Sequence, residues 1–270
     1  MLCFDFIYVW RVRLGPSVSQ TATDFALQVA SWREMLSAEE RRLADSFHGE
    51  NHRQDYIYAH AALHSVLGEC LGIPAASVRF IDGSAKGNGM HGKASGRIKP
   101  ALMPYSKDFQ VPVENQADLR FNLSHTRQAA LIGVSIGREL GIDIEWHRPM
   151  KDLDAMARAV MSDLELKQWQ SLRPEDQTRG FYNLWTRKEA YLKAIGLGLF
   201  RSLQEVTVPV SSEYLGDVLR GGYPVHDIAG VGKWCVRDIP ASSDYSASIC
   251  CEGESIPEIV VKEWDGDSTA

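Results

Sequence analysis

The sequence predicts an α+β protein built from two similar halves, and three observations lead to this fold class. Short segments rich in β-branched and aromatic residues, typical of buried strands, alternate with longer segments of helical periodicity. The order strand, helices, strands occurs twice along the chain. The helix-start pattern of Ser37 and Glu40 recurs at Ser162 and Glu165. We therefore expect an internal duplication, with a ligand-binding cleft between the two halves.

The first half is predicted to cover residues 1–138. Its helical segments are bounded by recognisable signals, since a capping box begins at Ser37 and Gly72 and Pro74 end a long helix. Ser124-His125-Thr126 is predicted to be the turn of a β-hairpin. In order, we predict a strand at 4–12, helices at 19–36 and 56–71, a strand at 78–81, and hairpin strands at 119–123 and 129–136.

Residues 82–119 differ in composition from the rest of this half. The segment is rich in Gly, Ser and Lys and has no apolar period, so we predict a long loop. Loops of this length are either functional or disordered.

The second half is predicted to cover residues 139–270. Its elements follow the same order as those of the first half, and the tail from about residue 252 is polar and acidic, so we expect it to be loose. In order, we predict a strand at 141–146, a helix at 181–192, and strands at 205–210, 233–239 and 245–251.

Composition excludes several classes of protein. The 270 residues are 44% hydrophobic and 24% charged, which is typical of a globular protein. A net charge of −6 disfavours general nucleic-acid binding. Five cysteines without a C-x-x-C pair predict neither a disulfide framework nor a zinc site. No signal peptide or membrane-crossing run is recognisable, so we expect a cytoplasmic protein with reduced thiols and no membrane partner.

The first candidate site is the pair Asp143 and Glu145. Residues two apart on a strand share a face, so both carboxylates point the same way, while Ile142 and Ile144 face the core. Neighbouring carboxylates are tolerated when solvated, when one is protonated, or when a cation lies between them. Oxygen donors favour Mg²⁺ or Mn²⁺. A half-exposed strand with an acidic outer face is the alternative.

The second candidate site is the helical face of Trp185, Glu189 and Lys193. These residues lie at i, i+4 and i+8, so their side chains share one side of a helix. The pattern is typical of a carboxylate and an ammonium group held in register for chemistry. The alternative is an exposed Glu–Lys pair that contributes about 0.3–0.5 kcal/mol to helix stability.

The third candidate site is the segment from Asn122 to Thr126. His125 in a tight turn can present its imidazole to a phosphate, and the hydroxyls of Ser124 and Thr126 can donate to phosphate oxygens. Ordinary turn chemistry is the alternative. A Ser–His hydrolase is disfavoured because no G-x-S-x-G elbow is present.

The three sites together are far more specific than any one of them. In the order FNLSHT (121–126), GIDIEW (141–146) and LWTRKEAYLKAIG (184–196), the chain resembles the larger, pseudo-two-fold 4′-phosphopantetheinyl transferases of the surfactin-synthetase-activating type. The resemblance implies two similar α+β halves related by pseudo-two-fold symmetry, with the active site between them. It also implies transfer of the phosphopantetheine arm of coenzyme A to a serine of an acyl or peptidyl carrier protein, with release of 3′,5′-ADP.

The resemblance also implies a role for individual residues. Asp143, Glu145 and Glu189 would hold Mg²⁺, or Mn²⁺, against the pyrophosphate of coenzyme A. Glu189 would take the proton of the attacking serine, directly or through a water. Lys193 would neutralise or protonate the leaving phosphate, so the catalytic group is Glu189, Lys193 and Asp143. His125 and Ser124 would bind the pyrophosphate.

The coenzyme A contacts outside these motifs are less regular. The basic residues that members of the family place on the first-half helix, against the 3′-phosphate, align with Asp55 and His64 here, and Arg53 is the candidate replacement. The family's Gly-Lys-Pro stretch near the adenine corresponds to Lys99-Pro100 or to the segment around Lys86. The predicted coenzyme A contacts are His125, Ser124, Arg53, Lys86, Lys99, Pro100 and Lys193.

Three functions follow in order of preference. The first is an active transferase that is monomeric, because its cleft needs no second subunit, with coenzyme A as co-substrate and an apo carrier protein as partner. The second is a catalytically weakened relative that binds coenzyme A or a carrier protein in a regulatory role, suggested by Asp55 and His64. The third is a Mg²⁺-dependent phosphohydrolase on the same scaffold.

Overall fold

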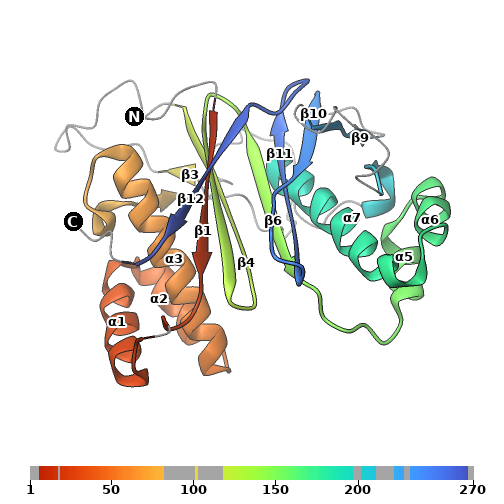
Figure 1. Cartoon of the computed structure of the whole chain (residues 1–270). Coiled ribbons are helices and arrows are strands. Elements are labelled where there is room, and N and C mark those ends of the chain that lie inside the picture. Colours follow the sequence, from red (N-terminus) through yellow and green to blue (C-terminus); the bar gives the residue numbers. More distant parts are fainter. Residues whose placement is uncertain are drawn as a thin grey trace.

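The computed structural model describes residues 6–17, 19–81, 101–102, 118–196, 202–210, 222–227 and 232–266. Helices α1 to α3 cover one side of a first sheet, and helices α5 to α7 cover the far side of a second sheet (Figure 1). The α+β fold class is therefore confirmed.

The first half begins with a strand, continues with three helices and ends with a hairpin. Its elements are β1 (Phe6–Arg13), α1 (Ala22–Met35), α2 (Ala38–Asp45), α3 (Glu50–Leu71), the 3-10 helix η1 (Ala75–Ser77), β2 (Phe80–Ile81), β3 (Ala101–Leu102), β4 (Leu119–Thr126) and β5 (Ala129–Ile136).

The second half also begins with a strand that is followed by three helices. Its elements are β6 (Leu140–Trp146), α5 (Leu153–Val160), α6 (Asp163–Gln170), α7 (Pro174–Ile195), the 3-10 helix η4 (Leu203–Glu205), β7 (Val206–Thr207), β8 (Tyr223–Pro224), β9 (His226–Asp227), β10 (Trp234–Asp238), β11 (Tyr245–Glu252) and β12 (Glu258–Trp264).

The two main sheets have the strand orders β12-β1-β5-β4 and β6-β11-β10-β8. One hydrophobic core lies between the first sheet and α1 to α3, and another between the second sheet and α5 to α7. A third core lies between the sheets themselves and joins Ile7 and Val9 of β1 to Ile142 and Ile144 of β6. Alternation along each strand produces this division, because successive side chains point to opposite faces.

The order of elements repeats as predicted, since β1-β5-β4 of the first sheet corresponds in chain order to β6-β11-β10 of the second. Both capping boxes form: the backbone N–H of Glu40 donates to Ser37 Oγ, and that of Glu165 donates to Ser162 Oγ. The pseudo-two-fold relation and the division at residues 138 and 139 stay predictions.

Three local predictions are wrong. Ser124-His125-Thr126 is the end of β4, and the turn lies at Arg127 and Gln128, where Gln128 has a φ of 56°. The long helices begin earlier than predicted, at Glu50 and Pro174. The predicted strand at 205–210 is reduced to β7, which follows the 3-10 helix η4.

The prediction of a loose tail from about residue 252 is also wrong. Residues 258–264 form β12, which pairs in parallel with β1 from Phe6↔Glu258 to Val12↔Trp264. Acidic residues at both ends of this segment mask its strand pattern in the sequence. Val260 and Trp264 of the strand pack against the core of the first half.

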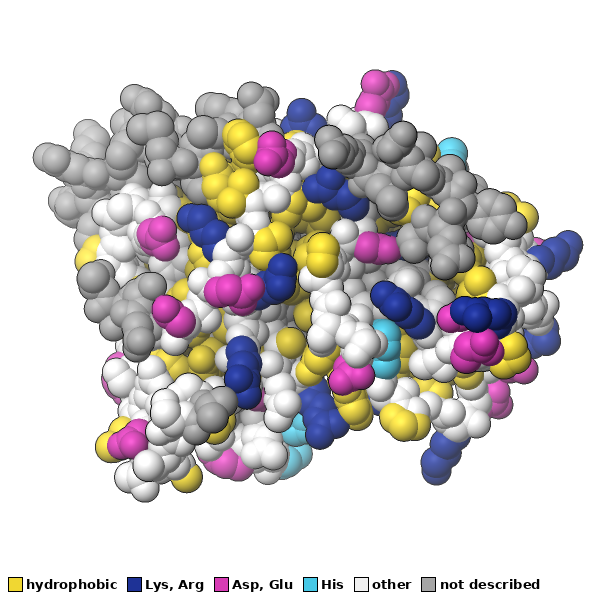
Figure 2. Space-filling view, in the orientation of Figure 1, with side chains coloured by type: hydrophobic (Ala, Val, Ile, Leu, Met, Phe, Trp, Pro, Cys, Tyr) yellow, Lys and Arg dark blue, Asp and Glu magenta, His cyan; other side chains and the backbone are white. Residues whose placement is uncertain are grey.

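The predicted loop at 82–119 lies mostly outside the described residues; of these, 101–102 form β3, which pairs with β2. None of the helices in the described ranges has the length and apolar character needed to cross a membrane. On the face shown in Figure 2, acidic and basic side chains are interspersed and neither sign forms a continuous field.

Candidate active site

The predicted site residues meet where α7 crosses β6. Asp143 and Glu145 lie on the face of β6 opposite to Ile142 and Ile144, which are buried between the sheets. Because α7 packs against that opposite face, Glu189 and Lys193 come into the electrostatic range of both carboxylates. The structure therefore brings the strand motif and the helix motif close together, and their role as one site stays a prediction.

Gly141 permits this close approach, and sequence reasoning gave it no role. A Cβ atom at residue 141 would lie 2.1 Å from the carbonyl oxygen of Ala190 and 2.4 Å from the backbone nitrogen of Ala194. Only glycine lets the α7 backbone contact β6 here. A signal was present in the sequence, since Gly141 is two residues before Asp143 and so shares its face.

Asp143 is the centre of a buried polar network. Its Oδ1 accepts a hydrogen bond from Ser124 Oγ at 2.9 Å and an ion-pairing hydrogen bond from Lys193 Nζ at 2.6 Å. Lys193 Nζ also donates to Ser124 Oγ at 2.9 Å. The side chain of Asp143 is 5% exposed and its Oδ2 has no hydrogen-bond partner. One carboxylate oxygen is thus satisfied and the other is left available.

Glu145 and Glu189 are carboxyl groups that resist ionisation. Burial, reinforced by the negative charge of Asp143, raises the pKa of Glu145 to about 7, although Lys193 and a hydrogen bond from Trp185 oppose the shift. Burial and Asp143 likewise raise the pKa of Glu189 to about 7. Glu189 Oε1 is buried without a hydrogen-bond partner. This electrostatic crowding would be relieved by a cation or by a proton.

The donor chemistry of this site suits a divalent cation, but the arrangement is not that of a formed metal centre. Three carboxylates supply the hard oxygen donors that Mg²⁺ and Mn²⁺ prefer, and two of their oxygens are unpartnered. Nevertheless, no group of three or more His, Cys, Asp or Glu side chains in the described ranges is placed to hold a metal ion. The predicted Mg²⁺ ligands stay a prediction.

His125 and Ser124, predicted as a pair, do not point the same way. Ser124 is buried and faces Asp143, whereas His125 follows it on β4, is exposed, and by strand alternation extends from the other face. The structure therefore places Ser124 in the network around Asp143.

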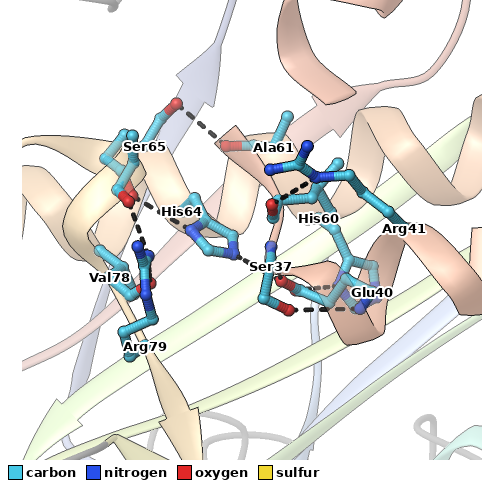
Figure 3. Close-up of polar contacts among 12 residues, drawn as sticks. Ser37, Glu40, Arg41, His60, Ala61, His64, Ser65, Val78 and Arg79 are labelled. Atoms are coloured by element: carbon cyan, nitrogen blue, oxygen red, sulfur yellow. Dashed lines mark hydrogen bonds and ion pairs between the residues drawn. The ribbon is translucent and has the colours of Figure 1, made fainter. Parts of the chain in front are cut away.

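The predicted coenzyme A residues of α3 are engaged within the first half. Arg53 donates to Glu50 Oε2 at 2.7 Å and to the carbonyl of Phe47 at 3.2 Å. Asp55 is half-buried, and burial raises the pKa of its carboxyl group. His64 is fully buried and contacts Glu40, as Figure 3 shows. His64 is therefore not accessible to a phosphate. Lys86, Lys99 and Pro100 lie outside the described residues.

Comparisons with known proteins now give this site a family. The family model described as the 4′-phosphopantetheinyl transferase superfamily matches residues 139–250, which include β6 and α7. The 4′-phosphopantetheinyl transferase HetI of Nostoc sp. is 31% identical over 210 residues, which cover 78% of this chain and 76% of HetI. The 4′-phosphopantetheinyl transferase psf-1 of Bacillus pumilus is 26% identical over 205 residues, which cover 76% of each chain.

A solved structure gives a weaker likeness. Thermotoga maritima holo-acyl-carrier-protein synthase has 15% sequence identity and a TM-score of 0.31, and the match covers 43% of this chain and 63% of that one. This likeness is too low to support a conclusion about this chain.

The protein belongs to the 4′-phosphopantetheinyl transferase superfamily. The match to HetI runs across both halves, so the chain is of the larger type rather than a single half. The resemblance seen in the three sequence motifs is thereby confirmed at the level of the family.

Proposed function

We propose that this protein transfers the 4′-phosphopantetheine arm of coenzyme A to a serine of an acyl or peptidyl carrier protein and releases 3′,5′-ADP. The observation on which the proposal rests is the meeting of Asp143, Glu145, Glu189 and Lys193 between β6 and α7. Three carboxylates and one ammonium group in a largely buried site match the needs of phosphoryl transfer, which depends on placement and charge neutralisation.

A divalent cation, Mg²⁺ or Mn²⁺, is part of the proposal. Asp143, Glu145 and Glu189 are its proposed ligands, supported by the unpartnered Asp143 Oδ2 and Glu189 Oε1. When bound, the ion supplies positive charge to the pyrophosphate oxygens of coenzyme A. Ser124 supports this function indirectly, since its hydroxyl donates to Asp143.

The residues of the chain have distinct roles in the proposed reaction. The serine oxygen of the carrier attacks the phosphorus atom next to pantetheine, and the bond from that phosphorus to the bridging oxygen of 3′,5′-ADP breaks. The carboxylate of Glu189 accepts the serine proton directly or through a water. Lys193, already beside Asp143, offsets the charge that develops on the leaving phosphate or protonates it.

Coenzyme A recognition is assigned to residues of both halves. Ser124, His125, Arg53, Lys86, Lys99, Pro100 and Lys193 remain its proposed contacts. A monomer in the cytoplasm is also proposed, since all four site residues come from one chain and the described cysteines Cys70, Cys235, Cys250 and Cys251 are free thiols.

A transfer assay tests the proposal. The purified chain is incubated with coenzyme A, Mg²⁺ and a panel of apo carrier proteins, and each carrier is weighed by mass spectrometry. We expect at least one carrier to gain the phosphopantetheine mass and Glu189→Gln to slow the transfer about 100-fold or more. Glu175→Gln, at an exposed position on the same helix, is the matched control and should transfer normally. If no carrier in the panel is modified, the transferase proposal fails for those carriers.

A non-catalytic relative that binds coenzyme A or a carrier in a regulatory role is the second candidate. The engagement of His64 with Glu40 and of Arg53 with Glu50 favours it, because both side chains are occupied within the first half. Calorimetry separates the two functions. Coenzyme A binding without transfer to any carrier supports the regulatory role, and transfer excludes it. Release of free phosphopantetheine without a carrier would instead support a phosphohydrolase.

A further inference from the structure

Strands β4 and β6 lie side by side although they belong to different sheets. Each is the edge strand of its own sheet. The contact between them is made by side chains of β4 and backbone amides of β6: Ile142 N–H donates to Asn122 Oδ1 at 2.8 Å, and Ile144 N–H donates to Ser124 Oγ at 3.3 Å. Two side chains thus replace the backbone acceptors that a neighbouring strand would normally provide.

The two hydrogen bonds are spaced so that they hold the β6 backbone on either side of one residue. Asn122 and Ser124 are two residues apart and so share a face of β4, and their partners Ile142 and Ile144 are also two apart, in the same chain direction. The residue between the two bonded amides is Asp143. The backbone is therefore fixed by β4 immediately before and immediately after this carboxylate.

The region around Asn122 is closely packed. Asn122 is 9% exposed, and its partner in the β4–β5 register is Gly133. A Cβ atom on Gly133 would lie 2.9 Å from Leu140 Cδ1 and 3.5 Å from Ile142 Cδ1, so side chains of β6 fill the space that this glycine leaves. An acceptor lost at Asn122 would leave the N–H of Ile142 buried and unpaired.

We propose that Asn122 is a positioning residue for the reaction: its side-chain oxygen holds the backbone of β6 so that Asp143 faces Lys193 and Ser124. Ser124 contacts Asp143 directly, whereas Asn122 accepts its hydrogen bond from the amide of the preceding residue, Ile142. The catalytic consequence rests on the proposed function, whereas the effect on the β6 backbone does not.

The test uses three variants of the full chain. Asn122→Leu has nearly the same shape but no acceptor, and Asn122→Asp keeps the acceptor oxygen. Ser135→Ala is the matched control, because Ser135 is a buried β5 residue whose hydroxyl donates to the carbonyl of Arg138, which lies before β6. Circular dichroism and thermal unfolding confirm that each variant folds. If Asn122→Leu fails to fold, Asn122→Ala takes its place.

Hydrogen–deuterium exchange of peptides covering residues 140–146 is the first readout. We expect faster exchange of these amides in Asn122→Leu and near-normal exchange in Asn122→Asp and Ser135→Ala. Unchanged exchange in Asn122→Leu would overturn the proposal, and this result does not depend on whether the protein is a transferase.

Transfer kinetics and Mn²⁺ binding, followed by electron paramagnetic resonance, are the second and third readouts. In Asn122→Leu we expect kcat to fall about 10- to 100-fold and Mn²⁺ affinity to fall, with KM for the carrier protein changed less than about twofold. An equal fall of kcat in Ser135→Ala would show that loss of stability, not positioning, causes the effect. If the wild-type chain modifies no carrier, the proposed function fails. Hydrogen–deuterium exchange still tests whether Asn122 holds the backbone of β6.

Discussion

Helices α3 and α7 are the long helices of the two halves, and they are held in nearly the same way. Each runs for 22 residues and ends at a glycine in the left-handed conformation, Gly72 with a φ of 68° and Gly196 with a φ of 70°. In each half, the glutamate of a capping box contacts a basic side chain of the long helix. That side chain also contacts the carbonyl of the first residue of the following 3-10 helix.

The basic side chain differs between the halves. Lys188 Nζ, fully buried, donates to Glu165 Oε2 at 2.6 Å and to the carbonyl of Leu203 at 2.8 Å. His64, also fully buried, has Nε2 3.1 Å from Glu40 Oε2 and Nδ1 3.1 Å from the carbonyl of Ala75 (Figure 3). Both ring nitrogens of His64 face acceptors, and both can donate only if the ring is doubly protonated. Lys188 and His64, two buried basic side chains, therefore occupy equivalent positions in the two halves.

The proposed catalytic side chains, by contrast, occur on one of these two helices only. The offset that aligns α3 with α7 places Ser65 and Glu69 opposite Glu189 and Lys193. Strand β1, which packs against α3, contributes Tyr8 and Trp10 to an aromatic cluster, with Lys262 Nζ 4.9 Å from the centroid of Trp10. The buried contacts that hold the long helix thus occur in both halves, whereas the proposed catalytic residues occur in one.

Breaking the buried ion pair of the second half is expected to have the largest effect. Lys188→Met leaves the carboxylate of Glu165 buried without its cation, and such a loss costs about 3–5 kcal/mol of unfolding free energy. Urea denaturation measures it. Adding Glu165→Gln should recover part of the loss, because the uncompensated charge is removed. A loss below about 1 kcal/mol in the single variant would show that this pair does not hold α7.

The contact of α7 with β6 is the next feature to break. Gly141→Ala puts a Cβ atom against the α7 backbone, so the helix must move; we expect a loss near the upper end of the roughly 1–3 kcal/mol typical of overpacking. The transfer rate should also fall, even at temperatures where the variant is fully folded, because Glu189 and Lys193 move with the helix.

Gly133→Ala is the matched control for Gly141→Ala. Its Cβ atom would meet the flexible end of Leu140 at 2.9 Å instead of backbone, so the neighbour can adjust. Thermal unfolding and the transfer assay on both variants make the comparison. Equal effects at the two glycines would contradict a specific role for Gly141.

Much of the fold could be predicted from the sequence because it depends on local signals. The capping boxes at Ser37 and Ser162 and the stop at Gly72 each mark a helix boundary through nearby residues. The tail could not be predicted in this way, since β12 is a strand only because β1, far away in the sequence, offers it an edge. In this segment, pairing with β1 determines the structure more strongly than the acidic composition does.

The candidate site shows the same division. Asp143, Glu145, Glu189 and Lys193 could be grouped by period and resemblance, and the structure brings them together. The residues whose roles were not predicted acquire those roles only through contact with another element of the fold. Gly141 acquires its role from the α7 backbone, and Asn122 from the amides of β6. His64 was considered as a phosphate contact, but Glu40 and Ala75 occupy both of its ring nitrogens.

The pH dependence of stability sharpens the comparison in the first half. Burial alone would raise the pKa of Glu40, but hydrogen bonds from His60 and His64 outweigh it and hold that pKa well below its usual range. A depressed folded-state pKa means that Glu40 stabilises the protein above the unfolded pKa of about 4.3, and that this stabilisation is lost as pH falls toward the folded value.

Glu40→Gln tests this. We expect a cost of about 2 kcal/mol near pH 5.5, where Glu40 is ionised, and a steadily smaller cost as pH is lowered to 3. Guanidinium denaturation at each pH measures the difference from wild type. A cost that is constant over this range would show that the ionised form of Glu40 does not hold the two histidines.

The smallest expected effects are those of the two capping serines, and they test the equivalence of the halves most directly. Ser37 Oγ accepts from the N–H of Glu40 at 3.2 Å, and Ser162 Oγ accepts from that of Glu165 at 3.4 Å. Ser37→Ala and Ser162→Ala should each cost about 1 kcal/mol, which is typical of a lost N-cap. Because each serine also orients a glutamate that contacts a buried basic side chain of the long helix, the two costs should agree within about 0.5 kcal/mol, measured by urea denaturation. A clearly larger cost at Ser162 would mean that the half containing the candidate active site depends more strongly on its cap, and that only the geometry of the duplication, not its energetics, is shared.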